Sequence, residues 1–409
     1  MKSSHKRDSH GAATAPELAI LGAPPAFAEK RHVGRPNIGD RQALLARIND
    51  LLDRRWLTNQ GRYVQEFEAR LAQYLGVRHA IAMCNGTVAL EIAIRALGLK
   101  GEVLVPSFTF VATAHALQWQ EITPVFCDAD PATHNIDPAR IERHITPRTT
   151  GIIGVHLWGR PCAVEALDEI ARHRGLRLMF DAAHALGASH GGKMIGNFGD
   201  AEVFSFHATK FFNTFEGGAV ATNDDELAQK IRLMKNFGFA GFDNVIYIGT
   251  NGKMSEVSAA MGLTGLESLD AFIAINRRNH AAYARGLEGL PGIVLLDYAD
   301  GEKRNYQYII LEIDAARAGL TRDQLLQVLL AENVIARRYF YPGCHRMEPY
   351  RSYFPHAGLL LPETERLCER VLCLPTGTDM DEASIDKVCA ILHAALARAE
   401  QVQAHLSRR

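Results

Sequence analysis

This sequence has no excess of positive or negative charge, no long apolar run and few cysteines. Each of these features excludes a class of protein. The 409 residues carry 45 lysines and arginines against 46 aspartates and glutamates, which gives a formal net charge of -1 at pH 7. This balance offers no electrostatic footprint for nucleic acid or for an anionic membrane. No apolar run reaches the length of about 20 residues that a transmembrane helix requires. We therefore expect neither nucleic acid nor a membrane among the partners.

The few cysteines also carry information. There are seven, an odd number, and they are scattered without the spacing of a metal site or of a disulfide framework. Most of them lie inside apolar segments such as PVFCD and RVLCLP. This usage is typical of reduced core residues, so we expect a cytoplasmic protein that holds no metal.

What the chain does contain, from about residue 80, is a regular alternation of short apolar runs and amphipathic helical stretches. Helices are predicted over residues 87–99 and 164–175. The alternation predicts an α/β fold with a large, mainly parallel sheet that helices cover on both faces, and ligands of such sheets bind at the carboxyl ends of the strands. The strand candidates are residues 80–84, 102–106, 123–128, 151–156, 176–181, 201–206 and 218–222.

The sequence divides into three segments. Residues 1–33 combine a basic start with a short apolar patch that acidic and proline residues interrupt, so we predict a flexible or loosely docked tail and not a signal peptide. Residues 34–260 are assigned to the large α/β domain that would bind a cofactor. Residues 261–409 are assigned to a small C-terminal α+β domain, with the boundary inside a long helical stretch, residues 255–290.

Asp181 ends the strand candidate LRLMFD and precedes a helix-like stretch. On this feature alone, the commoner role of an aspartate is to cap the helix that follows. The alternative is a carboxylate at the carboxyl end of a central strand, where a heterocyclic cofactor would lie. His184 falls near Asp181 if the segment turns helically, although a lone histidine in such a place is more often an ordinary core residue.

The segment CNGTVAL, residues 84–90, ends a strand, turns at Asn85 and Gly86, and starts a helix near Thr87. It is either a simple turn with a threonine cap or a phosphate site made by exposed N–H groups and the helix dipole. The dipole contributes only ~0.3–2 kcal/mol. Further phosphate ligands or a covalent bond would therefore be needed to hold a cofactor.

Lys210, in SFHATKFFNTFEGGAVAT, is either an ordinary surface lysine or the source of that bond. A lysine in a water-poor pocket has a depressed pKa and condenses with an aldehyde. Ser205 would add a hydroxyl to the phosphate site, and Gly217 and Gly218 would allow a close backbone approach. The order Gly-Thr, Asp, Ser, Lys on successive strand ends predicts a pyridoxal phosphate site. No G-x-G-x-x-G motif follows a strand, which disfavours a dinucleotide-binding fold.

Seven longer motifs extend this pattern over nearly everything after residue 33. They are WLTNQGRYVQEFEARLAQYLGVRHAIAMCNGTVAL, VPSFTFVATAHAL, TPVFCDADPATHNID, GVHLWGRP, FDAAHALGA, SFHATK and GTNGKMSEVSAAMGL. With these motifs the sequence resembles the sugar aminotransferases of the DegT/DnrJ/EryC1/StrS family. The resemblance implies the aspartate aminotransferase fold, which is fold type I of the pyridoxal phosphate enzymes.

The resemblance also implies a role for each matching catalytic residue. Lys210 would be the Schiff-base lysine and the proton shuttle. Asp181 would pair with the pyridine nitrogen of the cofactor and keep it protonated. His184 stands where the family carries Gln or His, close to the phenolic oxygen of the cofactor.

The remaining cofactor contacts follow from the same resemblance. Phe110, in SFTFVAT, would lie against the ring face. Gly86, Thr87 and Ser205 would hold the phosphate. Asn251 matches an asparagine that reaches the phosphate of the neighbouring subunit, so the family is expected to work as a homodimer with shared sites.

The C-terminal motifs NFGF, GTNGKMSE, RRNHAAY, YFYPGCHRMEPYRS and VLCLPTGT are similar to enzymes that aminate carbon 4 of dTDP-4-keto-6-deoxyglucose. The resemblance implies that L-glutamate supplies the amino group and that the product is dTDP-4-amino-4,6-dideoxyglucose, a precursor of antibiotic or surface sugars. Tyr341 and His345 would face the nucleotide sugar, although Tyr341 fits a simple turn equally well. Arg337 and Arg338 are either diphosphate ligands or a solvated edge.

Three alternatives stay open at this point. The same chemistry at carbon 3, or on a GDP-linked sugar, would use an identical core site. A pyridoxal phosphate-dependent sugar dehydratase of this family would carry histidine in place of Lys210. A non-catalytic regulator would lack part of the site, whereas every expected cofactor residue is present.

Overall fold

A seven-stranded sheet forms the centre of the larger part of the molecule in the computed structural model, which describes residues 17–298 and 301–408. The strand order is β2-β10-β9-β6-β5-β3-β4; the pairs from β9 to β4 are parallel, whereas β10 is antiparallel to both of its neighbours. The predicted mainly parallel sheet is confirmed, and each predicted strand contributes to it. The strands are β2 His79–Met83, β3 Glu102–Pro106, β4 Thr123–Cys127, β5 Thr149–Val155, β6 Arg177–Asp181, β9 Ala201–Ser205 and β10 Gly218–Thr222.

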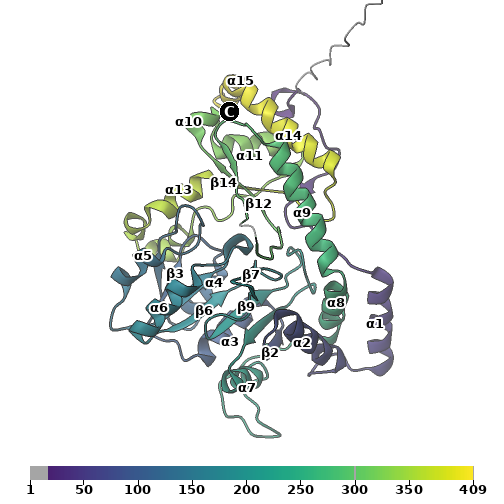
Figure 1. The fold of residues 1–409 in the computed structure, drawn as a ribbon, viewed down its shortest axis with the longest axis vertical. Coiled ribbons are helices and arrows are strands. Elements are labelled where there is room, and N and C mark those ends of the chain that lie inside the picture. The colour runs from purple at the N-terminus through teal and green to yellow at the C-terminus, as the bar shows by residue number, and fades with distance from the viewer. Residues whose placement is uncertain (1–16, 299–300, 409) are drawn as a thin grey trace, which may run out of the picture.

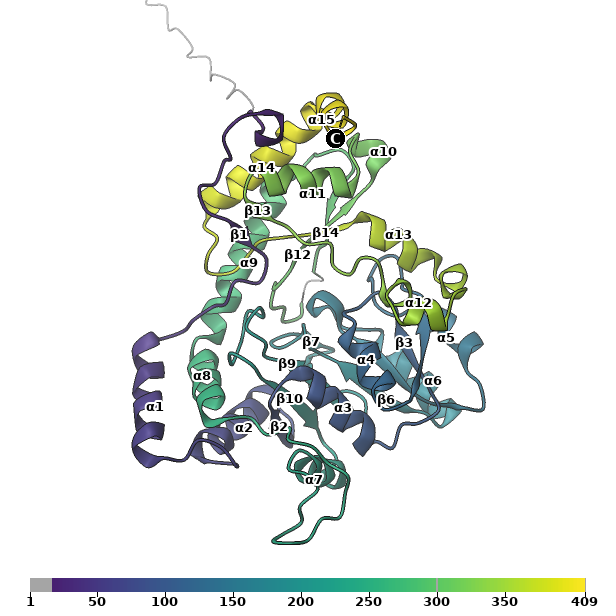
Figure 2. The same ribbon diagram turned by 180° about the vertical axis from the view of Figure 1, so that it is seen from behind.

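Helices cover both faces of this sheet (Figures 1 and 2). Alternate residues of β2 show why: Ala80 and Ala82 enter one core with α2 and α8, whereas Ile81 and Met83 enter another with α3, α4 and α7. The two helices predicted from the sequence are confirmed, with ends shifted by at most three residues. The helices of this part are α1 Arg41–Arg54, α2 Arg62–Leu75, α3 Gly86–Ala96, α4 Ala112–Gln118, α5 Pro138–Ile141, α6 Val164–Arg174, α7 Asp225–Met234 and α8 Glu256–Glu267.

The C-terminal part is an α+β unit on a three-stranded antiparallel sheet, β11-β12-β14. No single helix in the described part of the chain is long and apolar enough to span a membrane; α8 and α9 pass by length and composition only as a pair bent by 61°. The elements are α9 Leu269–Gly286, β11 Ile293–Leu295, β12 Ile309–Ile313, α10 Ala315–Ala318, α11 Arg322–Ala331, β13 Val334–Ile335, α12 Tyr350–Tyr353, α13 Pro362–Arg370, β14 Val371–Leu374, α14 Glu382–Ala397 and α15 Ala399–Leu406.

The long helix α9 connects the two cores. Met261 and Leu263 of α8 pack in the core of the large sheet. Phe272 of α9 still packs in the core of the large sheet, whereas Ala282 and Tyr283, about three turns further along α9, pack in the C-terminal core. The chain therefore passes from one core to the other along α9, and a boundary between residues 260 and 261 stays a prediction.

The segment before residue 34 is packed over the part that the structure describes, which differs from the predicted tail; residues 1–16 lie outside the described residues. Leu18 and Phe27 are buried in the C-terminal core. The Glu332 carboxylate accepts the backbone N–H of Ala19 at 2.7 Å, across 313 residues of sequence. The strand β1, Arg31–His32, then pairs in parallel with β13. No local pattern could predict this docking, because every partner of the segment lies far along the chain.

Candidate active site

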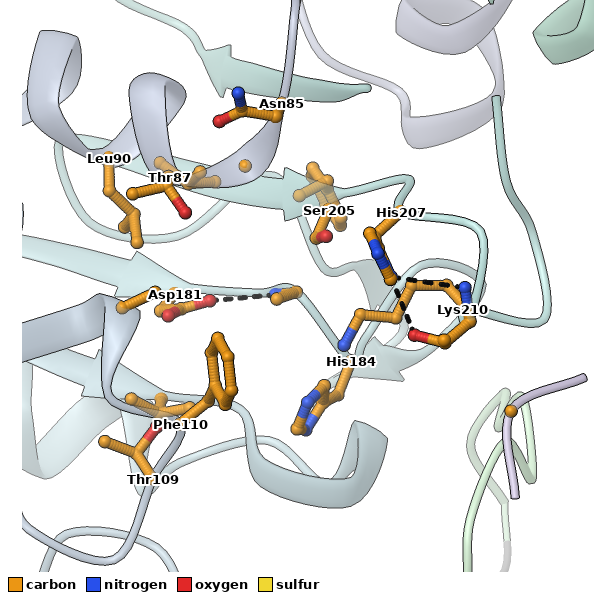
Figure 3. A pocket seen from close by; sticks show the side chains of 18 of the residues that line it. Asn85, Thr87, Leu90, Thr109, Phe110, Asp181, His184, Ser205, His207 and Lys210 are labelled. Carbon is orange, nitrogen blue, oxygen red and sulfur yellow. Dashed lines mark hydrogen bonds between the residues drawn. The ribbon is translucent and has the colours of Figure 1, made fainter. Parts of the chain in front are cut away.

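A cavity of about 570 Å³ opens at the carboxyl ends of the parallel strands, where sheets of this type bind their ligands. The ends of β6 and β9, the first turn of α3 and the loop before α4 form its walls (Figure 3). Residues that follow β13 also line it. Seven of the ten predicted site residues line this one cavity. They are Gly86, Thr87, Phe110, Asp181, His184, Ser205 and Lys210.

Asp181 is the last residue of β6 and is only 6% exposed. Its carboxylate accepts a hydrogen bond from the Thr113 hydroxyl at 2.8 Å and one from the backbone N–H of Ala183 at 3.0 Å. The residues that follow form turns and not the expected helical stretch, so the carboxylate caps only a turn. Burial raises the pKa of Asp181, while its hydrogen bonds and the Lys210 amine act in the opposite direction. The cavity therefore holds a carboxylate that two donors keep in one orientation.

Lys210 lies on a loop whose two ends are joined by a hydrogen bond of 2.8 Å from the Phe206 N–H to the Gly217 carbonyl. Its Nζ donates to the Tyr308 hydroxyl at 3.3 Å. Burial lowers the pKa of Lys210 to about 8, although the Asp181 carboxylate favours the charged amine. A substantial neutral fraction therefore exists near pH 8. Lys210 is thus a half-buried amine inside the cavity and not an ordinary surface lysine.

The turn before α3 provides the donors and the close approach that a phosphate requires. Asn85 caps the helix by accepting the Val88 N–H at 2.8 Å, and other N–H groups of the first turn have no intrahelical partner. A Cβ on Gly86 would lie 3.0 Å from the Cβ of Ser205, and one on Gly218 would lie 2.8 Å from the Gly86 nitrogen. Bare backbone is therefore required here, beside the Ser205 hydroxyl. This donor set fits a phosphate group.

Aromatic rings form another wall of the cavity. His184 is buried, and its ring is nearly parallel to those of Trp158, with centroids 6.0 Å apart, and Phe340, at 5.8 Å. Its Nδ1 accepts the backbone N–H of Trp158 at 3.4 Å. Burial lowers the pKa of His184 well below its usual range, so the ring is neutral and carries its proton on Nε2. Phe110 is 57% exposed and projects into the cavity (Figure 3).

Asn251, in the loop that precedes α8, does not line this cavity. It is exposed, and its carbonyl lies 3.8 Å from the Cys84 sulfur. The Cys84 N–H also donates to the Gly252 carbonyl at 2.8 Å. The loop therefore runs beside the turn that begins α3, and the reach of Asn251 into a neighbouring subunit stays a prediction.

The two predicted sugar contacts also lie outside the cavity wall. The Arg338 guanidinium lies over the Tyr341 ring, 4.2 Å from its centroid. His345 is buried between the Ser107 hydroxyl, 2.7 Å away, and the Glu365 carboxylate, 2.8 Å away. Both side chains therefore have partners within the chain, and their contact with a sugar stays a prediction.

Other residues of the C-terminal part complete the cavity. Arg337 is fixed by two backbone hydrogen bonds with Cys373, of 3.0 and 2.8 Å, and was weighed in the sequence only as half of a basic pair. The aromatic run YFYPG is a usable signal for its neighbours Tyr339 and Phe340, whereas the resemblance points to Tyr341. No local signal marks a tyrosine 98 residues away as the partner of Lys210. The lining residues from this part are Tyr308, Arg337, Tyr339 and Phe340.

A half-buried lysine, an oriented carboxylate and a phosphate cradle in one cavity fit pyridoxal phosphate. A protein from Shigella dysenteriae, named dTDP-4-amino-4,6-dideoxy-D-glucose transaminase, is 38% identical over 362 residues, which cover 88% of this chain and 97% of that protein. The GDP-perosamine synthase of Caulobacter vibrioides is 37% identical over 353 residues, 84% of this chain and 93% of that protein.

Solved structures agree with these relatives. The crystal structure of DesI in the presence of its TDP-sugar product is 52% identical, with a TM-score of 0.91 over 95% of this chain and 98% of that one. The model of the DegT/DnrJ/EryC1/StrS aminotransferase family matches residues 39–393. The chain therefore belongs to the DegT/DnrJ/EryC1/StrS aminotransferase family, whose cofactor is pyridoxal 5'-phosphate.

Proposed function

We propose that the enzyme transfers the amino group of L-glutamate to carbon 4 of dTDP-4-keto-6-deoxyglucose, which gives dTDP-4-amino-4,6-dideoxyglucose and 2-oxoglutarate. In the net reaction the amino group and the ketone oxygen exchange places, so no further reactant is needed. The observation that carries the proposal is the meeting of Lys210, Asp181 and the first turn of α3 at one cavity. The names of the relatives support the sugar and the carbon that is aminated.

Pyridoxal phosphate, when bound, supplies a conjugated ring that stabilises negative charge on the substrate carbon. We propose that Gly86, Thr87 and Ser205 hold its phosphate, since backbone N–H groups and two hydroxyls converge there. Asp181 would accept a hydrogen bond from the ring nitrogen with the carboxylate that Thr113 and Ala183 already orient. A carboxylate at this position favours the protonated nitrogen, which strengthens the electron-withdrawing power of the ring.

Lys210 would hold the cofactor and then move a proton between two carbon atoms. A pKa of about 8 places the amine close to the pH of the cell, so it can accept a proton and return it. Phe110 would cover one face of the ring. His184, neutral with its proton on Nε2, has a donor for the phenolic oxygen. Phe110 and His184 would together shield the reacting atoms from water on the side that faces the protein core.

Arg337 is suited to the charge of the substrates. The cavity is lined by one lysine, Lys210, and one arginine, Arg337. Arg337 has no ion pair within residues 17–298 and 301–408. Its neighbour Arg338, by contrast, pairs with Asp323 at 3.1 Å. Both the nucleotide diphosphate and glutamate are anions, so we propose that Arg337 binds one of them. In Arg337→Gln, an increase in KM for only one substrate would identify which.

We also propose a homodimer with shared sites. The loop between α7 and α8 projects from the molecule (Figures 1 and 2) and exposes a row of apolar side chains that a monomer would leave in water. Asn251 stands at the base of this loop, so a second copy packed on the loop would receive it. The exposed apolar residues are Phe237, Phe239, Phe242, Val245, Ile246 and Ile248. The seven cysteines are all free, which supports a cytoplasmic location.

A panel of nucleotide keto-sugars tests the substrate. The purified enzyme is incubated with L-glutamate and the 4-keto or 3-keto form of dTDP-6-deoxyglucose, or with GDP-4-keto-6-deoxymannose, and the products are identified by mass and NMR. We expect the 4-keto dTDP-sugar to react with the highest kcat/KM. Preference for the 3-keto compound would reject the assigned carbon. Preference for the GDP-sugar would reject the nucleotide, an alternative that the GDP-perosamine synthase relatives keep open.

A further inference from the structure

Thr113 lies in the first turn of α4 and faces Asp181. The role inferred for it rests on the proposed function. Thr113 is fully buried, and its hydroxyl lies 2.8 Å from Oδ2 of Asp181. We propose that Thr113 is a positioning residue of the amino-transfer reaction. It fixes the rotation of the Asp181 carboxylate and thereby sets how well that carboxylate serves the ring nitrogen of the cofactor.

The hydroxyl has one proton and three oxygen neighbours. Besides Asp181 these are the Thr109 hydroxyl and the Phe110 carbonyl, each at 3.2 Å. The proton goes to the carboxylate, because that contact is the shortest and a charged acceptor strengthens it. Thr109 then donates to Thr113. The result is a chain of two hydroxyls that ends on Oδ2 of Asp181.

The other carboxylate oxygen is fixed independently, by the Ala183 N–H at 3.0 Å. One donor alone would leave the carboxylate free to rotate about its last bond. Two donors, one on each oxygen and from different elements, determine its plane. The lone pairs that remain are those that the cavity can use.

The same residue connects two groups of the cofactor site. The Thr113 N–H donates to the Phe110 carbonyl at 3.2 Å, so the loop that presents the Phe110 ring begins the helix that carries Thr113. A strand, β5, lies between β3, from which this loop leaves, and β6, which ends at Asp181. Thr113 therefore ties the ring-covering loop to the carboxylate across a strand.

The test compares three variants of the cofactor-loaded enzyme. Thr113→Val removes the hydroxyl and keeps the shape, Thr113→Ser keeps the hydroxyl, and Thr222→Val removes a buried hydroxyl at the end of β10 that lies away from Gly218. We expect Thr113→Val to lower kcat by about tenfold to a hundredfold, the worth of one hydrogen bond to a charged group, with KM for the keto-sugar within about twofold. Titration of the cofactor-free protein should also show that this variant binds pyridoxal phosphate about threefold or more weakly, because the carboxylate that meets the ring nitrogen is no longer held in one orientation. Thr113→Ser should recover most of the loss, and Thr222→Val should behave as wild type.

A double mutant separates positioning from packing. If Thr113 acts through Asp181, then adding Thr113→Val to Asp181→Asn should lower kcat by less than about twofold beyond the single Asp181→Asn variant. Equal losses in Thr113→Val and Thr113→Ser, or a full additive loss in the double mutant, would overturn the inference. Should Thr113→Val not fold, Thr113→Ser and Thr113→Cys, which have strong and weak donors, provide the same comparison. Wild-type enzyme that transfers no amino group would instead reject the proposed function itself.

Discussion

At the scale of the residue, the proposed function depends on the neutral fraction of one amine, that of Lys210. We expect Lys210→Ala to lose at least about a thousandfold in kcat, because the variant lacks both the covalent anchor and the proton carrier. Circular dichroism should show an unchanged fold. Lys193→Ala, which removes an exposed lysine from a short hairpin, is the matched control and should keep full activity. Normal turnover in Lys210→Ala would contradict the assignment.

Asp181 provides a second prediction at this scale. Asp181→Asn should retain bound cofactor but lower kcat by at least about a hundredfold, because an amide cannot hold the ring nitrogen protonated. The Asp181 carboxylate favours the charged form of Lys210. Its loss should therefore move the pKa of Lys210 below about 8, which pH-dependent labelling of the amine in cofactor-free protein would detect. A raised pKa, or a near-normal rate, would mean that Asp181 only caps a turn.

The sequence indicates these two residues as candidates because Asp181 ends one apolar strand, β6, and Lys210 lies in the loop that follows another, β9. The Asp-Ala-Ala-His segment is predicted to be helix-like but forms turns, because alanine favours helix whereas tertiary contacts, such as those of the Asn305 side chain with the carbonyls of His184 and Leu186, impose turns. Tyr308 and Arg337 could not be found in this way. Their place at the cavity depends on how the C-terminal part docks on the sheet, which no local pattern encodes.

At the scale of the element, the junction of β10 and α3 leaves no room for a side chain at Gly218. A Cβ on Gly218 would lie 2.8 Å from the backbone of Asn85 and of Gly86, so one of the two segments must shift. We expect Gly218→Ala to weaken the binding of pyridoxal phosphate by about tenfold or more, as measured by titration of cofactor-free protein.

The control for Gly218→Ala is Gly175→Ala, at the end of α6. Gly175 has a φ of +64° and open space around its Cα, so alanine there costs ~1 kcal/mol of stability without crowding anything. Cofactor affinity should stay unchanged in this control. If both variants bind the cofactor equally well, the close approach of the two segments is not needed for the cradle.

Strand length decides how well the sequence identifies each element. The strands of the large sheet were all predicted, because each is buried over most of its length and reads as an unbroken apolar run. The strands β1 and β13 have two residues each, and a run of that length carries no periodicity. The segment that contains β1 lies beside β13 because its residues Leu18 and Phe27 are buried in the core of the C-terminal part.

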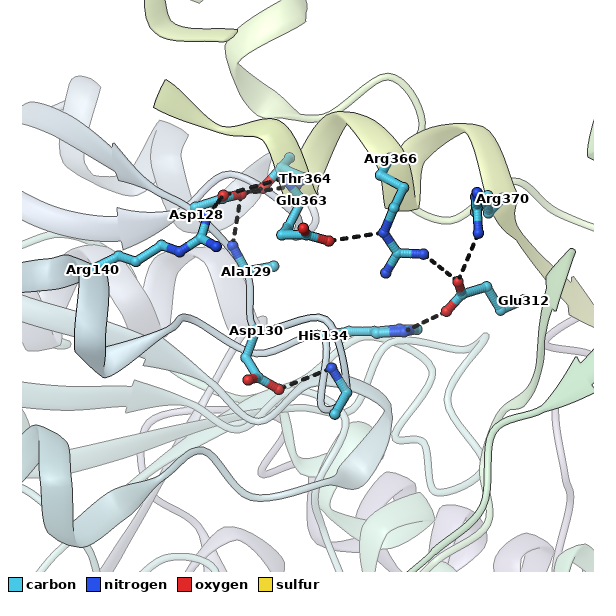
Figure 4. Close-up of polar contacts among 11 residues, drawn as sticks. Asp128, Ala129, Asp130, His134, Arg140, Glu312, Glu363, Thr364, Arg366 and Arg370 are labelled. Carbon is cyan, nitrogen blue, oxygen red and sulfur yellow. Dashed lines mark hydrogen bonds and ion pairs between the residues drawn. The ribbon is translucent and has the colours of Figure 1, made fainter. Parts of the chain in front are cut away.

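At the scale of the whole molecule, polar side chains join the C-terminal part to the strand ends of the sheet (Figure 4). Asp128, buried after β4, accepts the Thr364 N–H at 2.8 Å and so caps α13 from the other part. Glu312 of β12 pairs with Arg366 and lies 3.5 Å from His134. These contacts hold together the two halves of the cavity wall.

Glu312 makes this junction sensitive to acid. The hydrogen bond with His134 and the Arg366 guanidinium lower the pKa of Glu312 from 4.5 to about 2, against the effect of burial. Because the folded pKa is the lower one, the stabilisation is complete above pH 4.5 and is lost as the pH falls towards 2. Glu312→Gln should therefore cost ~1–2 kcal/mol at pH 7, and a decreasing amount below pH 4.5, in denaturant titrations. A loss that does not depend on pH would indicate a packing effect.

Shared sites give a prediction for the assembly. Lys210→Ala subunits and Asn251→Ala subunits are each expected to be impaired, and a mixed dimer would contain one site in which both residues are intact. When the two variants exchange subunits, about half of the dimers should be mixed, and each mixed dimer has one intact site of two. Mixing should therefore restore up to about a quarter of wild-type activity. No recovery, with exchange proven by mass spectrometry of the mixed dimer, would count against sharing.

The covalent position of the cofactor is the most direct test of the central claim. The enzyme loaded with pyridoxal phosphate is reduced with borohydride, which converts a carbon–nitrogen double bond at a lysine into a stable single bond, and its peptides are sequenced by mass spectrometry. We predict that the phosphopyridoxyl group is found on the peptide that contains Lys210. A modification at any other lysine, or none at all in a protein that still binds the cofactor, would contradict the account.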